Sequence, residues 1–416
     1  MEVYKFGGAS VKDADGVRNF VSVLKRLGRT RVVVVVSAMG KMTNAFEDIV
    51  RSFFKDSSLP EEQLDLAWQF HKNILRDLDI AENQEVHALV DGIFDEIREF
   101  LGNCDSMDFD YVYDQVVSRA ELLSTRICSA YLKIEGEAHN WLDVRECIRT
   151  NSDFRRARVD WEATCSRINE LVDTTCMTIT QGFLGSDADG NTTTLGREGS
   201  DYTAGIFAYC LNAEQVSVFK DVPGVLNADP RVFAQTSLLD QISYKEAIEM
   251  AFFGASVIHP KTLQPLQRKK IPLRVRSFLN PEAGGTRIEE GLPVVPLLPC
   301  YIVKKEQILV SVSDKEFHFV MESDISEIFG FLHRHKMKVN LIQNSAISFS
   351  VCIEDNFNNF IKLLEALQPR FKVLYNENVT LYTIRHFNKE AIDVVEKDQT
   401  VLLKQMSRET VQIIVK

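Results

Sequence analysis

The stretch Arg31-Val32-Val33-Val34-Val35-Val36-Ser37 places five valines in a row between two polar residues. A run that is apolar on both faces is typical of a central strand in a parallel sheet, because helices cover each side of such a strand. The segment 2–6 is another short apolar run. The sequence therefore predicts an α/β fold in this part of the chain.

Strand and helix patterns alternate from residue 1 to about residue 278. We expect helices at 15–27, 43–54, 61–100 and 114–132, a hairpin at 178–195 that turns at Asp189-Gly190, a helix capped by Ser200 or Asp201, and a strand at 215–219. This alternation predicts a layered α/β/α domain with a mainly parallel sheet.

Two glycine turns follow predicted strands and carry charged or hydroxyl side chains. The first is Lys5-Phe6-Gly7-Gly8-Ala9-Ser10, and the second is Leu195-Gly196-Arg197-Glu198-Gly199-Ser200-Asp201. Backbone amides at a glycine turn and at a helix N-terminus form a cradle for an anion, which is usually phosphate. One such turn is a weak signal, but the two together indicate phosphoryl transfer.

Composition limits the class of protein. A length of 416 residues predicts two or three domains, and 45% hydrophobic with 26% charged residues is typical of a soluble globular protein. A net charge of −11 disfavours nucleic acid and anionic membranes as partners, although it allows a local basic pocket for ATP. No apolar run could span a bilayer and no secretory signal is recognisable, so we expect a cytoplasmic protein. The eight cysteines form no CxxC pair, which disfavours both zinc sites and disulfides.

The order of predicted strands and helices changes after residues 280–299. This segment contains Asn-Pro, Gly-Gly and three further prolines, which indicate a linker. Strands are then expected at 308–313, 339–342, 347–353 and 371–375, with helices at 325–336 and 357–367. This order is the βαββαβ unit of ferredoxin-like folds. Residues 378–416 are too few for another full unit, which a strand near 301–304 could complete.

Together the motifs resemble those of the aspartokinases, in the amino-acid kinase family. The resemblance rests on six segments in the family's order: KFGGASV (5–11), SAMGKMTN (37–44), SRAELLST (118–125), GFLGSDADGNTTTLGREGSDYTA (182–204), KDVPGVLNADPR (220–231) and EMAFFGASVIHPKTLQPL (249–266). The C-terminal unit is similar to ACT domains. The resemblance implies a catalytic domain at 1–280, a linker at 281–300 and tandem ACT units at 301–416, with the complete unit at 307–376 inserted into a split one.

This resemblance implies an enzyme that phosphorylates the side-chain carboxylate of L-aspartate with ATP, on the route to lysine, threonine and methionine. Mg²⁺ is expected to arrive with the nucleotide, since the sequence shows no metal-ligand cluster. No homoserine dehydrogenase domain follows, so a monofunctional enzyme is expected. Two alternatives stay open: a kinase of the same family acting on glutamate, carbamate or UMP, and a catalytically impaired paralogue that binds amino acids.

The phosphoryl-transfer residues are assigned by the same resemblance. Lys5 would bridge the transferring phosphoryl oxygens, and Gly7 and Gly8 would let backbone amides approach them. Ser10 would contact phosphate or cap the next helix. Asp201 would orient the lysine, with a role as helix N-cap as the alternative.

The acceptor needs a partner for each of its charged groups. Arg197 can bind the α-carboxylate with two parallel hydrogen bonds, and Glu121 can bind the α-ammonium group. By resemblance Ser37, Thr43 and Ser200 complete the pocket. The alternatives are structural ion pairs for Arg197 and Glu121, and helix caps for Thr43 and Ser200.

Asp221 and Arg231 match the family's loop that holds ribose and phosphates. Lys220 stands where the family has threonine, and Ser256 where it has a lysine that faces phosphate. We hypothesise that Lys220 replaces the charge lost at Ser256, although it could instead point to solvent. His259 is expected to be structural, because an acceptor carboxylate is already ionised and needs no base.

The ACT resemblance implies a feedback effector, lysine or threonine, and a homodimer or dimer of dimers formed through these units. Candidate effector residues lie in one strand–strand turn and the loop opposite to it: Asn340, Gln343, Asn344 and Ser345 in the turn, and Met321 and Ser323 in the loop. A purely structural role in dimerisation is the alternative.

Overall fold

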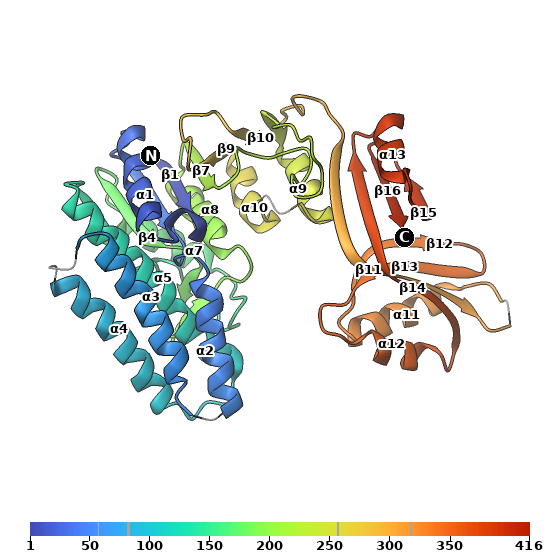
Figure 1. Ribbon diagram of the computed structural model, residues 1–416, viewed down its shortest axis with the longest axis horizontal. Helices are drawn as coiled ribbons and strands as arrows, with labels where there is room; N and C mark the ends of the chain where they lie inside the picture. The colour runs from blue at the N-terminus through green and yellow to red at the C-terminus, as the bar shows by residue number, and fades with distance from the viewer. Residues whose placement is uncertain (57, 81–83, 256–257, 317) are drawn as a thin grey trace. The chain divides into compact units, whose positions relative to one another are not determined.

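The computed structural model describes all residues except 57, 81–83, 256–257 and 317 (Figure 1). The chain divides into two compact units. The first comprises Met1–Val225, Leu238–Ile248 and Ser256–Pro296, and the second comprises Leu226–Ser237, Glu249–Ala255 and Leu297–Lys416.

The first unit is built on an eight-stranded sheet. Its strands lie in the order β3 (His139–Leu142), β4 (Met177–Gln181), β2 (Val32–Val36), β1 (Glu2–Phe6), β7 (Gln215–Lys220), β9 (Leu273–Ser277), β10 (Thr286–Glu289) and β8 (Gln241–Ser243). Neighbours are parallel except for β9 and β10. The predicted α/β fold with a mainly parallel sheet is confirmed.

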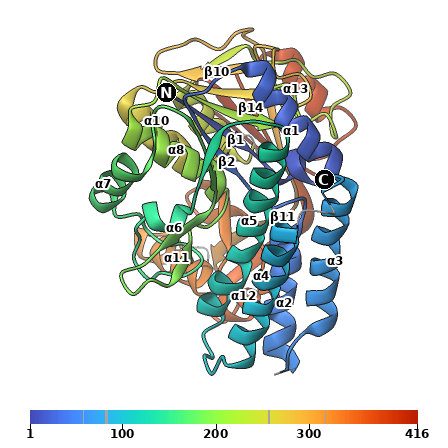
Figure 2. The ribbon, with the colours of Figure 1, turned by 90° about the vertical axis from the view of Figure 1, so that its left-hand side faces the viewer.

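Helices cover both faces of this sheet (Figure 1, Figure 2). They are α1 (Ala14–Leu27), α2 (Met42–Asp56), α3 (Glu61–Asp77), α4 (Gln84–Gly102), α5 (Phe109–Ile134), α6 (Val144–Cys147), α7 (Trp161–Leu171), α8 (Gly199–Leu211), α9 (Tyr244–Phe253), which continues into the second unit, and α10 (Pro260–Lys269). All five valines of β2 have no exposed surface. Val32, Val34 and Val36 share a core with α5, while alternation along the strand turns Val33 and Val35 to the opposite face. The central position expected for the valine run is therefore observed.

Several elements differ from the expectations. The stretch 61–100 forms two helices, α3 and α4. The hairpin is shorter than expected, because β4 joins the large sheet and only β5 (Leu184–Ser186) and β6 (Thr192–Thr194) pair around the Asp189-Gly190 turn. Helix α8 begins at Gly199 with Glu198 as its N-cap residue, so neither Ser200 nor Asp201 caps it.

The cysteines also differ from the expectation that disulfides are absent. The sulfur atoms of Cys165 and Cys210 are bonded. These residues lie 45 positions apart on α7 and α8, and packing of these two helices brings their Cα atoms to 4.8 Å. Sequence spacing alone cannot show such a contact.

The second unit is a six-stranded antiparallel sheet in the order β12 (Lys338–Asn344), β13 (Ser348–Glu354), β11 (Cys300–Asp314), β14 (Phe371–Arg385), β16 (Thr410–Val415) and β15 (Val401–Met406). Its own helices are α11 (Glu322–Arg334), α12 (Phe360–Leu367) and α13 (Lys389–Glu396). The long strands β11 and β14 pair along their length, with a register shift between Lys304 and Gln307. Two ferredoxin-like halves thus share one continuous sheet.

The expected linker at 281–300 contains regular structure. Strand β10 lies inside it and pairs with β8 and β9, so residues up to Pro296 belong to the first unit. Within the described residues, no helix is long and apolar enough to cross a membrane.

Candidate functional site

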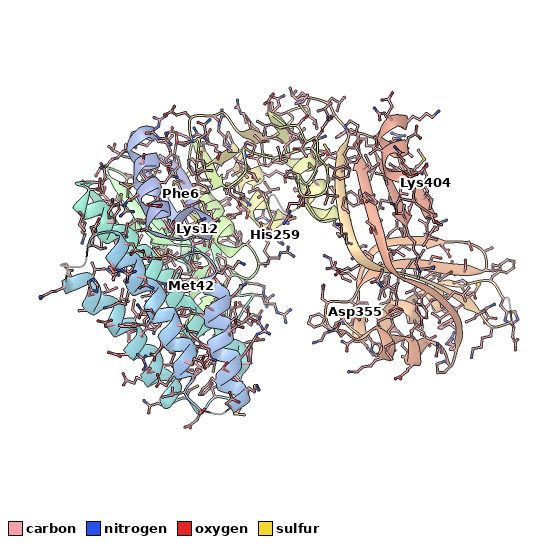
Figure 3. All side chains as sticks on the ribbon, viewed as in Figure 1. Phe6, Lys12, Met42, His259, Asp355 and Lys404 are labelled. Atoms are coloured by element: carbon pink, nitrogen blue, oxygen red, sulfur yellow. A yellow bond between two sulfur atoms is a disulfide. The ribbon has the colours of Figure 1, made fainter. Side chains whose placement is uncertain are left out.

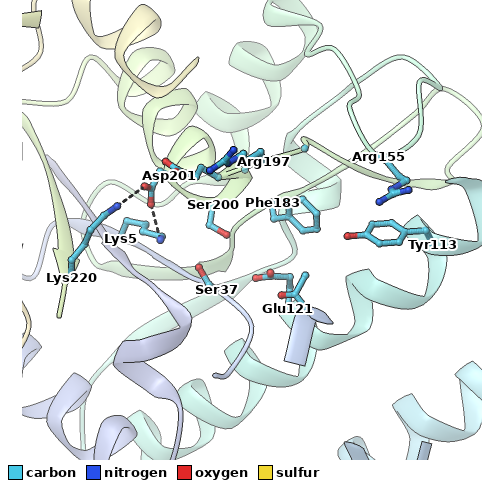
Figure 4. A pocket seen from close by; sticks show the side chains of 14 residues that line it. Lys5, Ser37, Tyr113, Glu121, Arg155, Phe183, Arg197, Ser200, Asp201 and Lys220 are labelled. Carbon is cyan, nitrogen blue, oxygen red and sulfur yellow. Dashed lines mark ion pairs between the residues drawn. The ribbon is translucent and has the colours of Figure 1, made fainter. Parts of the chain in front are cut away.

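A cavity of about 450 Å³ opens in the first unit, where the ends of β1, β2 and β7 meet the start of α8 (Figure 4). Fourteen residues line it: Lys5, Ser37, Thr43, Tyr113, Glu121, Arg155, Phe183, Gly196, Arg197, Glu198, Gly199, Ser200, Asp201 and Lys220. The carboxyl ends of neighbouring parallel strands are where α/β sheets commonly bind ligands.

Two loops at these strand ends approach each other closely through backbone atoms. A Cβ atom on Gly8 would lie 2.7 Å from the carbonyl oxygens of Ala38 and Gly40, and the Gly40 amide donates to the Gly8 carbonyl over 3.0 Å. A side chain at position 8 would separate the loops. Glycine there therefore permits the close approach of the two loops.

Asp201 lies between two lysines. Its Oδ1 is 2.6 Å from Lys5 Nζ and its Oδ2 is 3.6 Å from Lys220 Nζ. Burial acts to raise the pKa of Asp201, but the two ammonium groups outweigh it and hold the pKa below its ordinary value. The aspartate is consequently ionised at neutral pH, and it fixes both lysines against the cavity.

Glu121 lies on the face of α5 that meets the loop after β2 (Figure 4). Burial raises its pKa to about 8, an effect that the Ala38 amide and the charge of Lys5 offset only partly. Its Oε2 has no hydrogen-bond partner among the described residues. Such a carboxylate is suited to receive a cationic group from a ligand.

The remaining expected acceptor residues lie in the same cavity. Ser37, Thr43, Arg197 and Ser200 all line it. Ser124 on α5 donates to the Ser37 carbonyl over 2.7 Å, which ties the loop after β2 to α5. The structure therefore brings together the seven residues expected for catalysis and acceptor binding.

Sequence reasoning missed three lining residues, Tyr113, Arg155 and Phe183. Phe183 and Arg155 have backbone φ angles of 74° and 64°, in the region that favours glycine. The Arg155 amide donates to the buried Asp114, and its guanidinium lies over the Tyr113 ring at 4.4 Å. Nothing in the local sequence pattern signals a left-handed arginine, so only the fold reveals it.

The residues expected to bind the nucleotide are spread over more of the structure than the acceptor residues. Ser10 lies in the short 3₁₀ helix Gly8–Val11, and its buried Oγ has no hydrogen-bond partner in the described parts of the chain. It does not cap α1, because Asp13 does so by accepting from the Gly16 amide. A Cβ atom on Gly7 would lie 3.4 Å from Lys5 Nζ, so this glycine borders the cavity lysine.

Asp221 is exposed beyond β7, whereas Arg231 belongs to the second unit and pairs with Asp229 at 2.7 Å. Ser256 lies outside the described residues. His259, labelled in Figure 3, is the N-cap residue of α10 and accepts from the Lys261 amide. No group of three or more metal-ligating side chains occurs within the described ranges.

The candidate effector residues lie in two different places. The Val320 amide donates to the Ala346 carbonyl, which brings the loop with Met321 and Ser323 beside the β12–β13 turn. Within that turn Gln343, Asn344 and Ser345 are exposed. Asn340 instead faces the sheet, where it accepts from Lys304 Nζ over 2.7 Å and donates to Gln307 over 2.6 Å.

Comparison with known proteins adds to this geometry. A sequence profile of the amino acid kinase family matches residues 1–277. The chain belongs to the amino acid kinase family. Lysine-sensitive aspartokinase 3 of Escherichia coli is 34% identical over 362 residues, which are 85% of this chain and 78% of that protein. The resemblance of the chain to the aspartokinases is thereby confirmed.

Other relatives are longer. The chloroplastic bifunctional aspartokinase/homoserine dehydrogenase of Daucus carota is 28% identical, and the chain spans 42% of its length. Among solved structures, E. coli aspartokinase III in complex with lysine and aspartate gives a TM-score of 0.81, and the same protein in complex with aspartate and ADP gives 0.80. Each structure is 30% identical in sequence to this chain. Each match covers 100% of this chain and 96% of the solved chain.

Proposed function

We propose that this amino acid kinase is an aspartate kinase, which transfers the γ-phosphoryl group of ATP to the side-chain carboxylate of L-aspartate. The observation that carries the proposal is one cavity with two chemically different ends. Lys5, Asp201 and Lys220 lie at one end, and Glu121, whose Oε2 has no hydrogen-bond partner among the described residues, lies toward the other (Figure 4). Arg197 lines the same cavity.

The cationic end suits a phosphoryl group in transfer. A carboxylate oxygen of the acceptor forms a bond to the γ-phosphorus, and the bond from that phosphorus to the β,γ-bridging oxygen breaks to release ADP. Negative charge on the transferring oxygens is neutralised by Lys5 and Lys220, which Asp201 holds in place. The acceptor carboxylate is ionised at neutral pH, so no general base is needed.

The other end suits the α-carbon groups of an amino acid. Glu121 would receive the ammonium group, and Arg197 would bind the α-carboxylate through a bidentate pair. Ser37, Thr43 and Ser200 supply hydroxyl groups between the two ends. Anchoring both α-groups directs the side-chain carboxylate toward Lys5, and this length requirement favours aspartate over glutamate.

ATP is expected to bring Mg²⁺, which neutralises phosphate charge when bound. The crystal structure of E. coli aspartokinase III with aspartate and ADP supports nucleotide binding by this fold. Gly7, Gly8, Ser10 and Asp221 remain proposed nucleotide contacts, and Arg231 and Ser256 remain proposals without a placement beside the cavity.

We also propose that the second unit mediates dimerisation and feedback by an amino acid in the cytoplasm. Exposed apolar side chains gather where the loop before α11 meets the end of edge strand β12: Phe319, Met321, Ile342 and Ile347. An exposed apolar patch beside an unpaired edge strand is typical of an interface. A relative described as lysine-sensitive and a structure with bound lysine support an amino-acid effector.

The activity is tested by trapping the product, an acyl phosphate, with hydroxylamine. The full chain is incubated with MgATP and either L-aspartate or L-glutamate, with lysine and threonine added in separate reactions. Hydroxamate from aspartate alone supports the proposal, and its loss with one amino acid identifies the effector. A folded protein that yields no hydroxamate would favour the non-catalytic paralogue, and hydroxamate from glutamate would favour another kinase of the family.

A further inference from the structure

Arg155 has a left-handed backbone and lies against the turn that carries Arg197. Its φ is 64°, a region that a residue with a side chain adopts only at a cost. A Cβ atom on Gly196 would lie 3.2 Å from the Arg155 carbonyl oxygen. The Arg155 amide donates to the buried Asp114, which also accepts from the amide and the hydroxyl of Thr194. These contacts fix the Arg155 backbone next to the turn.

The guanidinium group of Arg155 clamps the ring of Tyr113. Its Cζ lies 4.4 Å from the centre of this ring and 5.5 Å from the centre of the Phe109 ring. One terminal nitrogen is 3.2 Å from Asp110 Oδ1, and the other is 3.6 Å from Glu47 Oε1. Two carboxylates therefore already neutralise this cation, and its place over the ring is that of a cation–π contact. Arg155 is consequently suited to hold Tyr113 rather than to bind a ligand anion.

Tyr113 lines the cavity at the end where the acceptor is expected. It precedes Glu121 by about two turns of the same helix, α5, and only 7% of its surface is exposed. Figure 4 shows Tyr113 at the end of the cavity opposite to Lys220, with Glu121 between them and the tyrosine hydroxyl directed inward. On α2, Glu47 follows the lining residue Thr43 by one turn. The ring and its clamp thus border the acceptor end.

This end of the cavity offers shape to a ligand rather than charge. Burial raises the pKa of Tyr113 to about 12, so its phenol is neutral at ordinary pH. The proposed contacts of the acceptor, Glu121 and Arg197, already account for both α-groups of an amino acid. A neutral ring that is held rigidly acts on a ligand through its volume, by leaving no room for a further substituent.

We propose that Tyr113, positioned by Arg155, determines acceptor specificity by closing the cavity beyond the α-groups, so that only a free amino acid fits. The inference rests on the proposed function, because it takes Glu121 and Arg197 as the α-group contacts. A methyl group on the α-nitrogen or an ester on the α-carboxylate would meet the ring. Removal of the ring opens space for such acceptors.

The test compares L-aspartate with N-methyl-L-aspartate and with L-aspartate α-methyl ester, by acceptor-dependent release of ADP from MgATP. The quantity measured is kcat/KM for each substituted acceptor divided by kcat/KM for aspartate. We expect Tyr113→Ala in the full chain to raise this ratio at least tenfold for one or both substituted acceptors. Tyr113→Phe keeps the ring and should keep the ratio. Loss of folded protein lowers all rates together, so it does not change the ratio.

Arg155→Gly tests the clamp without truncating the ring. Glycine suits the left-handed backbone, so the variant removes the guanidinium without adding strain. The freed ring should exclude substituted acceptors less well, and the ratio should rise at least threefold. Lys270→Gly is the matched control, because Lys270 is an exposed cation with φ of 57° that does not line the cavity. It should leave the ratio unchanged.

Three outcomes would overturn the inference. The first is an unchanged ratio in folded Tyr113→Ala and Arg155→Gly. The second is an unmodified chain that uses a substituted acceptor as efficiently as aspartate. The third is a ratio that rises equally in Lys270→Gly. In each of these cases aspartate still supports ADP release. An unmodified chain that releases no ADP with aspartate would remove the proposed function and the inference together, which distinguishes that failure from the others.

Discussion

At the scale of single residues, Asp201 controls the charge at the phosphate end of the cavity. Asp201→Asn leaves Lys5 and Lys220 without the carboxylate that holds them. We predict a fall in kcat of about 100-fold or more, because misplaced ammonium groups no longer meet the charge that develops on the phosphoryl oxygens. Steady-state kinetics at saturating ATP and aspartate measures this change in kcat. A kcat within about threefold of the unmodified enzyme would contradict this role.

Lys220 offers a separate test at the nucleotide. The side chain is mostly buried and lies in the cavity, so the hypothesis that it supplies phosphate-neutralising charge requires an effect on ATP. We predict that Lys220→Met raises KM for ATP about tenfold and changes KM for aspartate little. Lys55→Met, at the exposed end of α2, is the matched control. An unchanged ATP affinity would show that Lys220 does not replace the missing charge.

Glu121 makes aspartate binding depend on pH. Its folded-state pKa is raised to about 8 from 4.5, so the folded protein binds more protons than the unfolded chain between these values. The contribution of Glu121 to stability is therefore lost as pH rises from about 4.5 to 8. The acceptor's ammonium group needs the ionised form, so aspartate affinity should increase from about pH 6 to pH 8.

Glu121→Gln separates the two effects. The variant should lose the fall in unfolding free energy between about pH 5 and pH 8, measured by denaturant titration, and it should bind aspartate about tenfold more weakly at pH 8. A stability profile parallel to that of the unmodified protein would contradict a raised pKa for this group.

At the scale of elements, the loops after β1 and β2 approach each other closely at Gly8. Gly8→Ala would place a methyl group 2.7 Å from two carbonyl oxygens, so we predict a loss of about 1–3 kcal/mol in unfolding free energy and a large fall in kcat. Gly92→Ala in α4 meets no atom within 4 Å and should instead stabilise the chain by about 0.5–1 kcal/mol. Equal effects of the two variants would contradict the close approach.

Elements with a strong local signal could be predicted from the sequence, and those set by distant packing could not. The valine run of β2 and the helix pattern of α5 express burial on defined faces, so both were recognisable. The start of α8 at Gly199 depends on a left-handed Glu198, which no propensity predicts. The Cys165–Cys210 contact depends on how α7 meets α8, and the strand β10 depends on pairing with β8 and β9.

The site shows the same division. Lys5, Arg197 and Asp201 lie in glycine turns whose chemistry is visible in the sequence, and the fold brings them to one cavity. Tyr113 and Arg155 were missed because neither lies in one of the six motif segments, and Phe183 was missed although it lies in the segment 182–204, because an apolar side chain there carries no chemical signal. The unsatisfied oxygen of Glu198 is a property of three-dimensional packing, which the local sequence does not show.

At the scale of the whole molecule, the apolar patch on the second unit predicts self-association. We expect light scattering after size-exclusion chromatography to give at least a dimer, and Ile342→Asp to shift it toward monomer, because a buried unpaired carboxylate disfavours the interface. Val394→Asp introduces the same charge on an exposed position of α13 and should leave the assembly intact. A monomeric unmodified chain at micromolar concentration would contradict this assignment.

The central claim is that the cavity holds both α-groups of aspartate and presents its side-chain carboxylate to the phosphoryl group. Reduction of the reaction mixture with borohydride converts an acyl phosphate to the alcohol and so records which carboxyl group was phosphorylated. The claim predicts homoserine as the product, dependent on MgATP and on the unmodified chain. The isomer whose alcohol derives from the α-carboxyl group, or no alcohol at all, would contradict it.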